Sequence, residues 1–278
     1  MTTFPRTTVG GVSLSRMIVG TNWFLGYSHM SVAKDKFIKD YQTRDRIADV
    51  LGTFLEYGID TVMGPTSPLL VDAVRLAEDR AGQKIILVMT PAFSLAENCA
   101  KEDSAETAFD FCKKSGATFC MPHQCVTDAL IDRRAGVIRD IDHFTKLIRD
   151  RGMIPGLSTH MPEAVVYADK QNADIQTYIQ LYNSAGFLMQ VEVDWVMKVI
   201  QEAKQPVMTI KPLAAGKILP PVGLAFVWAT LRDCDMVTIG TTTSDEAKEC
   251  VELSLGFLEH RASGVKLQET RSKRSLRR

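Results

Sequence analysis

The chain lacks a net charge, because 33 Lys and Arg side chains balance 33 Asp and Glu side chains over 278 residues. Nucleic acids and acidic membrane surfaces are bound through an excess of positive charge. We therefore expect a small-molecule substrate as partner, and neither nucleic acid nor membrane; composition leaves the oligomeric state unknown. Only residues 271–278 are strongly basic, with five Arg or Lys and no acid, and we expect this tail to be disordered.

Long apolar runs are also missing, so we expect neither a signal peptide nor a membrane-spanning helix. The six cysteines include no C-x-x-C pair and show no spacing typical of a disulfide framework. Free thiols in a reducing compartment account for such usage. The sequence thus predicts a cytoplasmic protein.

What the chain does contain is a repeated unit of short apolar strand, polar strand end and helix. In one unit, Val207 to Ile210 suit a buried strand, Lys211 follows, and Pro212 cannot continue the strand. Comparable strands are expected at 16–21, 59–63, 84–89, 117–121, 153–157, 175–182 and 236–240.

Eight strands that alternate with helical patterns require parallel pairing through crossover helices. The sequence therefore predicts an α/β fold, a (β/α)8 TIM barrel in which residues 1–270 form a single domain. A doubly wound open sheet is the structural alternative. Helical periodicity or capping signals mark the intervening helices, at 45–57, from Ser67-Pro68 onward, from Asp103-x-x-Glu106 to Phe111, at 141–152, 191–203 and 223–231, and from Thr243-x-x-Glu246 onward.

Two segments outside this repeat have distinct expected roles. Residues 8–15 contain Gly10-Gly11 between short alternating runs, which predicts a β-hairpin that closes the bottom of the barrel. Residues 22–43 lack periodicity and contain several aromatic residues and lysines. A structureless segment of this length is usually functional, so we expect a lid-like loop over the barrel mouth.

The strand ends carry the candidate catalytic residues, because barrel active sites lie at the C-terminal ends of the strands. None of these ends carries Asp or Glu, which gives no support to carboxylate-pair glycosidase chemistry. His123 and His160 end consecutive strands, and two imidazoles can act as acid and base. They could also bind a metal, but the sequence supplies no clear third ligand, and no metal site is assigned.

Lys211 ends the seventh strand, where a charge is costly unless it is paired or its pKa is lowered. We expect it to bind a substrate oxygen as a cation; a Schiff-base nucleophile would require a lowered pKa. The structural alternatives are a lysine that reaches solvent and histidines bonded to backbone. Gly240-Thr241-Thr242-Thr243 begins a helix after strand eight, a position that favours phosphate, although such caps also occur without a ligand.

Several segments together resemble the aldo/keto reductase superfamily, a group of barrel enzymes that bind NADP(H). The resemblance extends in order through the barrel, although each motif alone is weakly specific. The similar segments are Thr8-Val-Gly-Gly-Val-Ser-Leu-Ser-Arg-Met-Ile-Val-Gly-Thr21, Gly156-Leu-Ser158-Thr159, Gln180-Leu-Tyr182-Asn183, Lys211-Pro-Leu-Ala-Ala-Gly216 and Ile239-Gly-Thr-Thr-Thr-Ser. The resemblance implies a cofactor site that includes Ser158, Gln180, Gly240, Thr241, Thr242 and Thr243.

The catalytic tetrad of that superfamily, Asp, Tyr, Lys and His, is not complete here. Only its His is matched, by His123, while Met63 stands at the Asp position and Thr90 at the Lys position. The Tyr position falls in residues 66–69, which contain no tyrosine. Tyr27 or His29 of the lid could substitute for the missing acid.

Three functions remain open from the sequence. The first is an enzyme that uses His123, His160 and Lys211 for acid–base chemistry on a small carbonyl or hydroxy-carbonyl (sugar-like) substrate, as a lyase or isomerase. The second is an NAD(P)H-dependent oxidoreductase with relocated acid–base residues. The third is a non-catalytic nucleotide-sensing or interaction protein.

Overall fold

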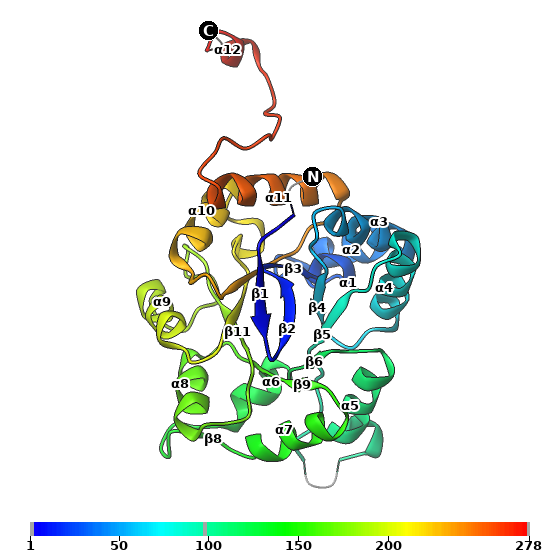
Figure 1. The fold of residues 1–278 in the computed structure, drawn as a ribbon, viewed down its shortest axis with the longest axis vertical. Helices are drawn as coiled ribbons and strands as arrows, with labels where there is room; N and C mark the ends of the chain where they lie inside the picture. The colour runs from blue at the N-terminus through cyan, green and yellow to red at the C-terminus, as the bar shows by residue number, and fades with distance from the viewer. Residues whose placement is uncertain (1–2, 97–98, 277–278) are drawn as a thin grey trace.

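A closed barrel of parallel strands forms the centre of the computed structural model, which describes residues 3–96 and 99–276 (Figure 1). Its sheet runs in the order β10-β11-β12-β13-β3-β4-β5-β6-β9. The strands are β3 (Met17–Gly20), β4 (Thr61–Gly64), β5 (Ile86–Met89), β6 (Phe119–Cys120), β9 (Ile154–Pro155), β10 (Leu157–Ser158), β11 (Tyr178–Leu181), β12 (Val207–Ile210) and β13 (Met236–Ile239).

Strands β9 and β10 are two halves of one strand, since only Gly156 separates them. A Cβ atom at Gly156 would lie 2.6 Å from Cε of Met121, so a side chain at this position would clash with the barrel interior. The two edges of the sheet are thus joined through the chain itself. The fold is the eight-stranded (β/α)8 barrel that the sequence predicts, and the open-sheet alternative is wrong.

Strand alternation separates an inner from an outer apolar layer. The inner layer fills the barrel and consists of Ile18, Met63, Val88, Phe119, Met121, Ile179, Met208 and Met236, with Val9 and Leu14 from the hairpin. Neighbours of these residues along the strands, such as Met17, Val19 and Val237, pack outward against the helices. This alternation explains why the strands are apolar throughout.

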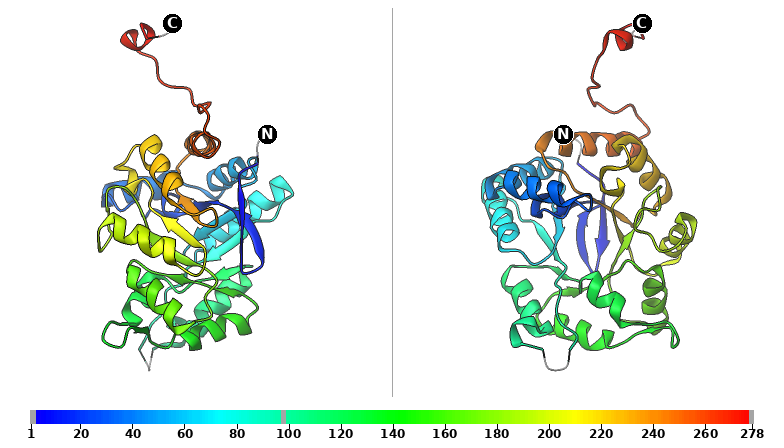
Figure 2. Two further views of the ribbon diagram at one scale, coloured as in Figure 1. Left: turned by 60° about the vertical axis from the view of Figure 1, so that its left-hand side comes forward. Right: turned by 180° about the vertical axis from the view of Figure 1, so that it is seen from behind.

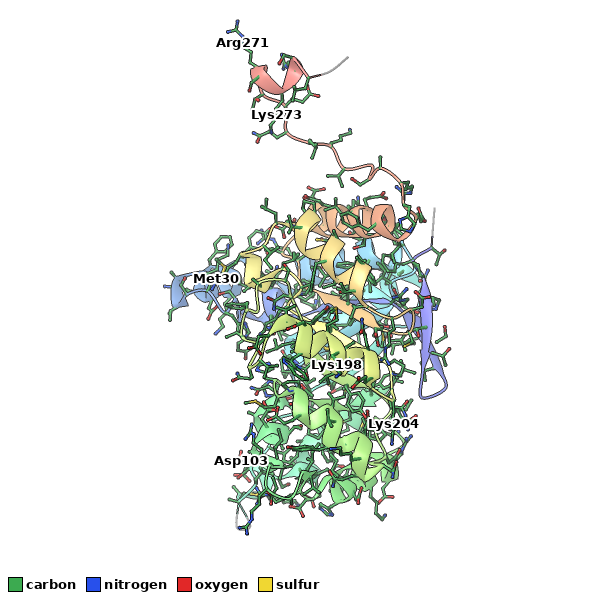
Figure 3. The ribbon with its side chains drawn as sticks, turned by 90° about the vertical axis from the view of Figure 1, so that its left-hand side faces the viewer. Met30, Asp103, Lys198, Lys204, Arg271 and Lys273 are labelled. Carbon is green, nitrogen blue, oxygen red and sulfur yellow. The ribbon has the colours of Figure 1, made fainter. Side chains whose placement is uncertain are left out.

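The hairpin of β1 (Arg6–Val9) and β2 (Val12–Ser15) covers one end of the barrel, as predicted. Gly10 and Gly11 have φ angles of 54° and 83°, which glycine adopts without strain at such a turn. Figure 1 shows the hairpin across the face turned to the viewer, and in Figure 3 it lies on the side opposite Met30.

Within the described ranges, eight helices surround the barrel, and α11 closes the ring by packing against both α10 and α3. Their bounds are α3 (Arg44–Leu55), α4 (Pro68–Ala81), α5 (Ala105–Lys114), α7 (Ile141–Asp150), α8 (Pro162–Gln171), α9 (Val193–Glu202), α10 (Pro220–Thr230) and α11 (Ser244–Leu258). Ser67 caps α4, and Thr243 and Glu246 form the predicted capping box of α11.

The predicted cap at Asp103 is wrong. Ser104 caps α5, because its hydroxyl accepts a hydrogen bond from the backbone N–H of Thr107 at 3.3 Å. Asp103 instead ends the short 3-10 helix η1 (Lys101–Asp103). Both residues are good helix caps, and the sequence spacing alone did not distinguish them.

The segment expected to be a lid-like loop is largely helical, which corrects the prediction for residues 22–43. It contains α1 (Asn22–Leu25) and α2 (Val32–Tyr41). Helix α2 buries only Ile38 among its side chains, so its sequence lacks the wide apolar stripe that marks a packed helix. In Figure 3, Met30 lies at the outer end of this segment, beyond the strand ends opposite the hairpin.

Short elements follow strand β6 and the barrel domain. After β6 come α6 (Gln124–Thr127), η2 (Asp128–Leu130) and the small hairpin of β7 (Ile131–Asp132) and β8 (Val137–Ile138). The chain leaves the barrel after α11, and the described part of the basic tail contains the one-turn helix α12 (Arg271–Arg274) rather than coil alone (Figure 2). None of the helices within the described ranges is long and apolar enough to cross a membrane.

Candidate active site

Lys211 and His29 meet at the barrel mouth, although 182 residues separate them in the chain. Lys211 follows β12, and His29 lies between α1 and α2. Nζ of Lys211 is 3.0 Å from Nε2 of His29. The helical lid thus supplies a side chain to the strand ends.

The proton on His29 can be placed from its partners. Nδ1 of His29 lies 2.9 Å from the backbone carbonyl oxygen of Tyr27, which can only accept a hydrogen bond. Nδ1 therefore carries the proton, and Nε2 of the neutral ring has a free lone pair. Desolvation lowers the pKa of His29, and the Lys211 charge lowers it further. At neutral pH, Nε2 accepts the hydrogen bond from Lys211.

Both partners of this contact have unusual backbone conformations. The φ angle is 58° at His29 and 61° at Lys211, in the left-handed region that side chains with a Cβ atom rarely adopt. Lys211 also precedes Pro212, and residues before proline favour extended conformations. Such strain costs on the order of 1–3 kcal/mol per residue and clusters at functional sites. The contact is thus held in place at a cost to stability.

His123 caps the start of α6 three residues after the end of β6, and its Nδ1 atom contacts Cys125. Nδ1 accepts from the backbone N–H of Cys125 at 3.4 Å and lies 3.1 Å from Sγ of that residue. The neutral ring therefore carries its proton on Nε2, which can donate to a substrate oxygen. Burial lowers the pKa of His123, and the Lys211 charge adds to this effect.

His160 follows β10, and its pKa is shifted more strongly than that of the other histidines in the site. Burial lowers its pKa from 6.5 to about 4, with smaller contributions from the charges of Lys211, His123 and His29. These contributions place the four residues in one electrostatic site. His160 is consequently a neutral base at physiological pH.

Lys211 itself is only partly protonated near neutrality. Burial lowers its pKa from 10.5 to about 8, which leaves roughly one tenth of the molecules with a free amine at pH 7. Within residues 3–96 and 99–276, none of the ion pairs joins a carboxylate to Lys211. The unprotonated fraction of the amine is available as a nucleophile.

Asp128 positions the loops that carry His123 and His160, and the sequence analysis did not identify this residue. One oxygen of its carboxylate accepts from the hydroxyl of Thr159, and the other accepts from the backbone N–H of His160 at 3.3 Å. Asp128 lies in η2, five residues after His123. It thereby ties the segment that follows β6 to the segment that follows β10. Its place in a 3-10 helix of three residues left no periodic signal.

The predicted phosphate site at Gly240 to Thr243 is already filled by the chain. Oε2 of Glu246 accepts from the backbone N–H of Thr242 at 2.6 Å and from that of Thr243 at 3.3 Å. A Cβ atom at Gly240 would lie 2.9 Å from Cδ1 of Trp23, so the indole covers this glycine.

The lid holds the same segment from the other side. Nε2 of Gln42, at the end of α2, donates to the carbonyl oxygen of Thr242 at 2.9 Å. In this arrangement the segment does not fit a nucleotide phosphate. We therefore derive no step through NADP.

Gln180 lies in β11, and its role in cofactor binding stays a prediction. Ile179 packs in the barrel interior, whereas Tyr178 and Tyr182 pack in the outer layer. Gln180 shares the face of the two tyrosines by strand alternation. It is 1% exposed, and its side-chain amide atoms have no partner within the described ranges.

Two other predicted cofactor residues are buried near the strand ends. Ser158 ends β10 and is 5% exposed. Thr241 follows β13, and its buried hydroxyl has no partner among the residues the structure describes. Cofactor binding by either residue stays a prediction.

The positions of the missing tetrad residues have other uses here. Met63 belongs to the barrel interior, and Thr90 is buried. Residues 66–69 line a cavity of about 330 Å³ beneath the lid, together with Phe24, Leu25, Tyr27, Lys39, Gln42 and Pro65. Tyr27 thus lies near the expected tyrosine position, and Nζ of Lys39 lies 5.8 Å from its ring centre.

Metal ligation finds no support beyond the histidines. In the part of the chain that the structure describes, no three His, Cys, Asp or Glu side chains are grouped so that they could hold a metal ion. The candidate site consists of His29, His123, His160 and Lys211, since Lys211 contacts His29 and its charge acts on all three histidines.

The barrel and its hairpin are similar in fold to solved structures of aldo-keto reductases. The structure is similar to PA4992 from Pseudomonas aeruginosa, assigned to the aldo-keto reductases, with a TM-score of 0.65 and 13% identity over 92% of this chain and 98% of that one. It is also similar to an aldo/keto reductase from Brucella melitensis, with a TM-score of 0.58 and 14% identity over 91% and 93% of the two chains.

A third neighbour is aldose reductase from Giardia lamblia, with a TM-score of 0.52 and 12% identity over 93% of this chain and 94% of that one. No protein-family model matches the sequence, and no curated protein does. At these identities the likeness shows the fold, and the chemistry has to be argued from the site.

Proposed function

We propose that this chain is an enzyme that moves a proton beside the carbonyl group of a small carbonyl or hydroxy-carbonyl substrate, as a lyase or isomerase does. The observation that carries the proposal is the 3.0 Å contact between Nζ of Lys211 and Nε2 of His29, with two more neutral histidines in the same electrostatic site. Perturbed groups of this kind cluster at functional sites.

Each residue has a role that its protonation state allows. His123 presents Nε2–H to the carbonyl oxygen, and Lys211 stabilises the charge that develops there. His160 is unprotonated at neutral pH and accepts the proton from the carbon beside the carbonyl. Its low pKa favours prompt return of that proton.

Carbonyl reduction is supported less well. The superfamily pattern supplies a proton from a tyrosine beside a lysine, and Met63 and Thr90 stand where two of its partners are expected. The segment of Thr242 and Thr243 is bonded to Glu246 rather than open to a phosphate. Both observations favour non-redox chemistry at these strand ends.

The proposal is tested by deuterium exchange. Dihydroxyacetone, glyceraldehyde and pyruvate are incubated with the protein in D2O, and NMR measures the enzyme-dependent loss of protons beside each carbonyl. We expect exchange with at least one compound, reduced by about 10²–10⁴-fold in Lys211→Met or His160→Gln. His143→Gln, a change at an exposed histidine of α7, is the matched control and should exchange as the wild type does.

The opposite result is equally clear. If none of the three compounds exchanges faster than in buffer while NADPH is oxidised by an aldehyde, the protein is a reductase. Tyr27→Phe and His29→Ala then become the informative variants, because these lid residues lie beside the cavity and beside Lys211 respectively.

A further inference from the structure

We infer that Lys211 binds the substrate covalently, as an imine formed between its Nζ atom and the carbonyl carbon, with His29 as the base that frees the amine. The inference rests on the proposed function for its site, but it specifies a bond that acid–base exchange alone does not require. It also identifies the substrate class as aldehydes and ketones that carry a hydrogen on the neighbouring carbon.

Geometry provides the first support. The lone pair on Nε2 of His29 points at Nζ of Lys211 across 3.0 Å, because Nδ1–H is committed to the carbonyl oxygen of Tyr27. A neutral acceptor at this distance can remove a proton from the ammonium group. Ordinary lysines that bind a substrate anion need no such acceptor, and a carboxylate would serve better as a partner for a permanent cation.

The backbone provides the second support. Lys211 and His29 both occupy the left-handed region, at φ angles of 61° and 58°. Ala214 and Ala215 in the next turn have positive φ angles as well, of 47° and 57°. The chain thus holds the lysine in one strained conformation at the end of β12, whereas a lysine that only reaches solvent needs no such fixed backbone.

Electrostatics provides the third support. Burial lowers the pKa of Lys211 to about 8, and the neighbouring histidines are neutral at pH 7. A desolvated lysine without a carboxylate partner is the usual form of an imine-forming amine. The same group with a full ion pair would be a poor nucleophile.

The proposed step balances without any oxidant or reductant. The ammonium of Lys211 transfers one proton to His29, and the free amine adds to the carbonyl carbon to give a carbinolamine. The carbon–oxygen bond then breaks, and the oxygen leaves as water with two protons that the ammonium originally held. The product is a protonated imine with one N–H, so the single positive charge is conserved. His160 can then remove the neighbouring proton to give an enamine.

Borohydride trapping tests the inference. The full-length protein is incubated at pH 7.5 with dihydroxyacetone or pyruvate and reduced with sodium borohydride, after which intact mass and peptide mapping locate the product. We expect one adduct per chain on Lys211, with the mass of the carbonyl compound less one oxygen. The adduct should form at least tenfold faster there than on any other lysine.

Variants separate catalysis from surface modification. Lys211→Met should lose the adduct, and Lys217→Met, a change at an exposed lysine six residues further along the chain, should keep it. His29→Gln should retain the adduct but form it at least tenfold more slowly at pH 7, with recovery as the pH rises above 8. That recovery would not occur if His29 merely supported the fold.

Each outcome of the trapping and exchange experiments either supports or contradicts the imine. Adducts spread evenly over surface lysines, or no adduct with either compound, would overturn the inference. Exchange in D2O without trapping would leave proton transfer in place and exclude the imine. Trapping without exchange would establish the reactive amine and contradict the proposed proton transfer, so the two claims fail separately.

Discussion

Adjacent strands β12 and β13 end in opposite ways at the same barrel mouth. After β12, Lys211 has a strained backbone, a lowered pKa and a neutral histidine as its contact. After β13, the backbone N–H groups of Thr242 and Thr243 are both satisfied by Glu246. In the first corner of the barrel mouth, after β12, a ligand would stabilise the groups. In the second corner, after β13, the backbone N–H groups already have hydrogen-bond acceptors within the chain.

This difference shows why strand-end position alone is a poor guide to function. Both corners carry the residue types expected of a ligand site, namely a lysine in one and a threonine-rich helix start in the other. What separates them is whether nearby groups of the chain satisfy their polar atoms. Reactive sites retain strain and shifted pKa values, and stable caps do not.

The largest expected effect comes from Asp128, which joins the segment after β6 to the segment after β10. Asp128→Ala removes two hydrogen bonds to a partly buried carboxylate and leaves the Thr159 hydroxyl without that acceptor. We expect a loss of about 3 kcal/mol in the free energy of unfolding and at least tenfold slower deuterium exchange, because both histidine loops shift. Urea unfolding and the exchange assay measure these effects.

Asp110→Ala is the matched control for Asp128, since the carboxylate of Asp110 is 55% exposed and pairs with Arg151. Such pairs contribute about 1 kcal/mol or less. Asp128→Asn retains one acceptor oxygen and keeps the test informative if the alanine variant does not fold. Equal stability of the Asp128→Ala and Asp110→Ala variants would show that the two histidine loops do not depend on this tether.

Lys211→Met is expected to change the free energy of unfolding by a smaller amount and in the opposite direction, as an increase. The pKa of Lys211 is about 8 in the folded protein and 10.5 in the unfolded chain, so the unfolded state binds more protons between these pH values. Wild-type stability therefore rises from pH 8 to 10.5, and below pH 8 the buried charge carries its full cost. Lys211→Met should be more stable at pH 7 by on the order of 2 kcal/mol, with the gain lost by pH 10.5.

Chemical unfolding at pH 7 and pH 10.5 measures this gain, with Lys217→Met as the control because Lys217 is exposed. The variant should be more stable yet inactive, as expected for a functional group that destabilises its own fold. A variant less stable than the wild type at pH 7 would mean that the contact with His29 outweighs the cost of burial.

Most of the barrel could be predicted from the sequence, but little of the candidate site could. Runs such as Met236 to Ile239 predicted the strands, because they are buried on both faces and strand propensity is local. The Thr243-x-x-Glu246 capping box is also local, and it formed as predicted. Helix α2 was missed since it buries only Ile38 and so shows no apolar stripe.

The site depends on relations that no local pattern encodes. The pairing of His29 with Lys211 joins residues 182 positions apart through two left-handed backbone conformations. The role of Asp128 arises only when the segments after β6 and β10 lie side by side. The face of β11 on which Gln180 lies likewise depends on a single residue of strand register.

The smallest expected effect concerns the second corner, where Glu246→Gln tests whether the cap excludes anions. Glutamine can still fill a capping box, so we expect stability to fall by less than about 1 kcal/mol. Removal of the negative charge from a helix N-terminus should strengthen binding of sulfate or NADP+ by about two- to fivefold, since such charges are worth 0.3–1 kcal/mol. Glu249→Gln removes the same charge from the same helix one turn later and should leave affinity nearly unchanged. Calorimetric titration of the two variants at low ionic strength compares them directly.

Trp23→Ala in the Glu246→Gln background should further strengthen anion binding, because the indole covers Gly240. If the wild type already binds NADP+ tightly and neither change alters its affinity, the nucleotide lies elsewhere on the barrel and the contrast between the two corners does not govern cofactor binding.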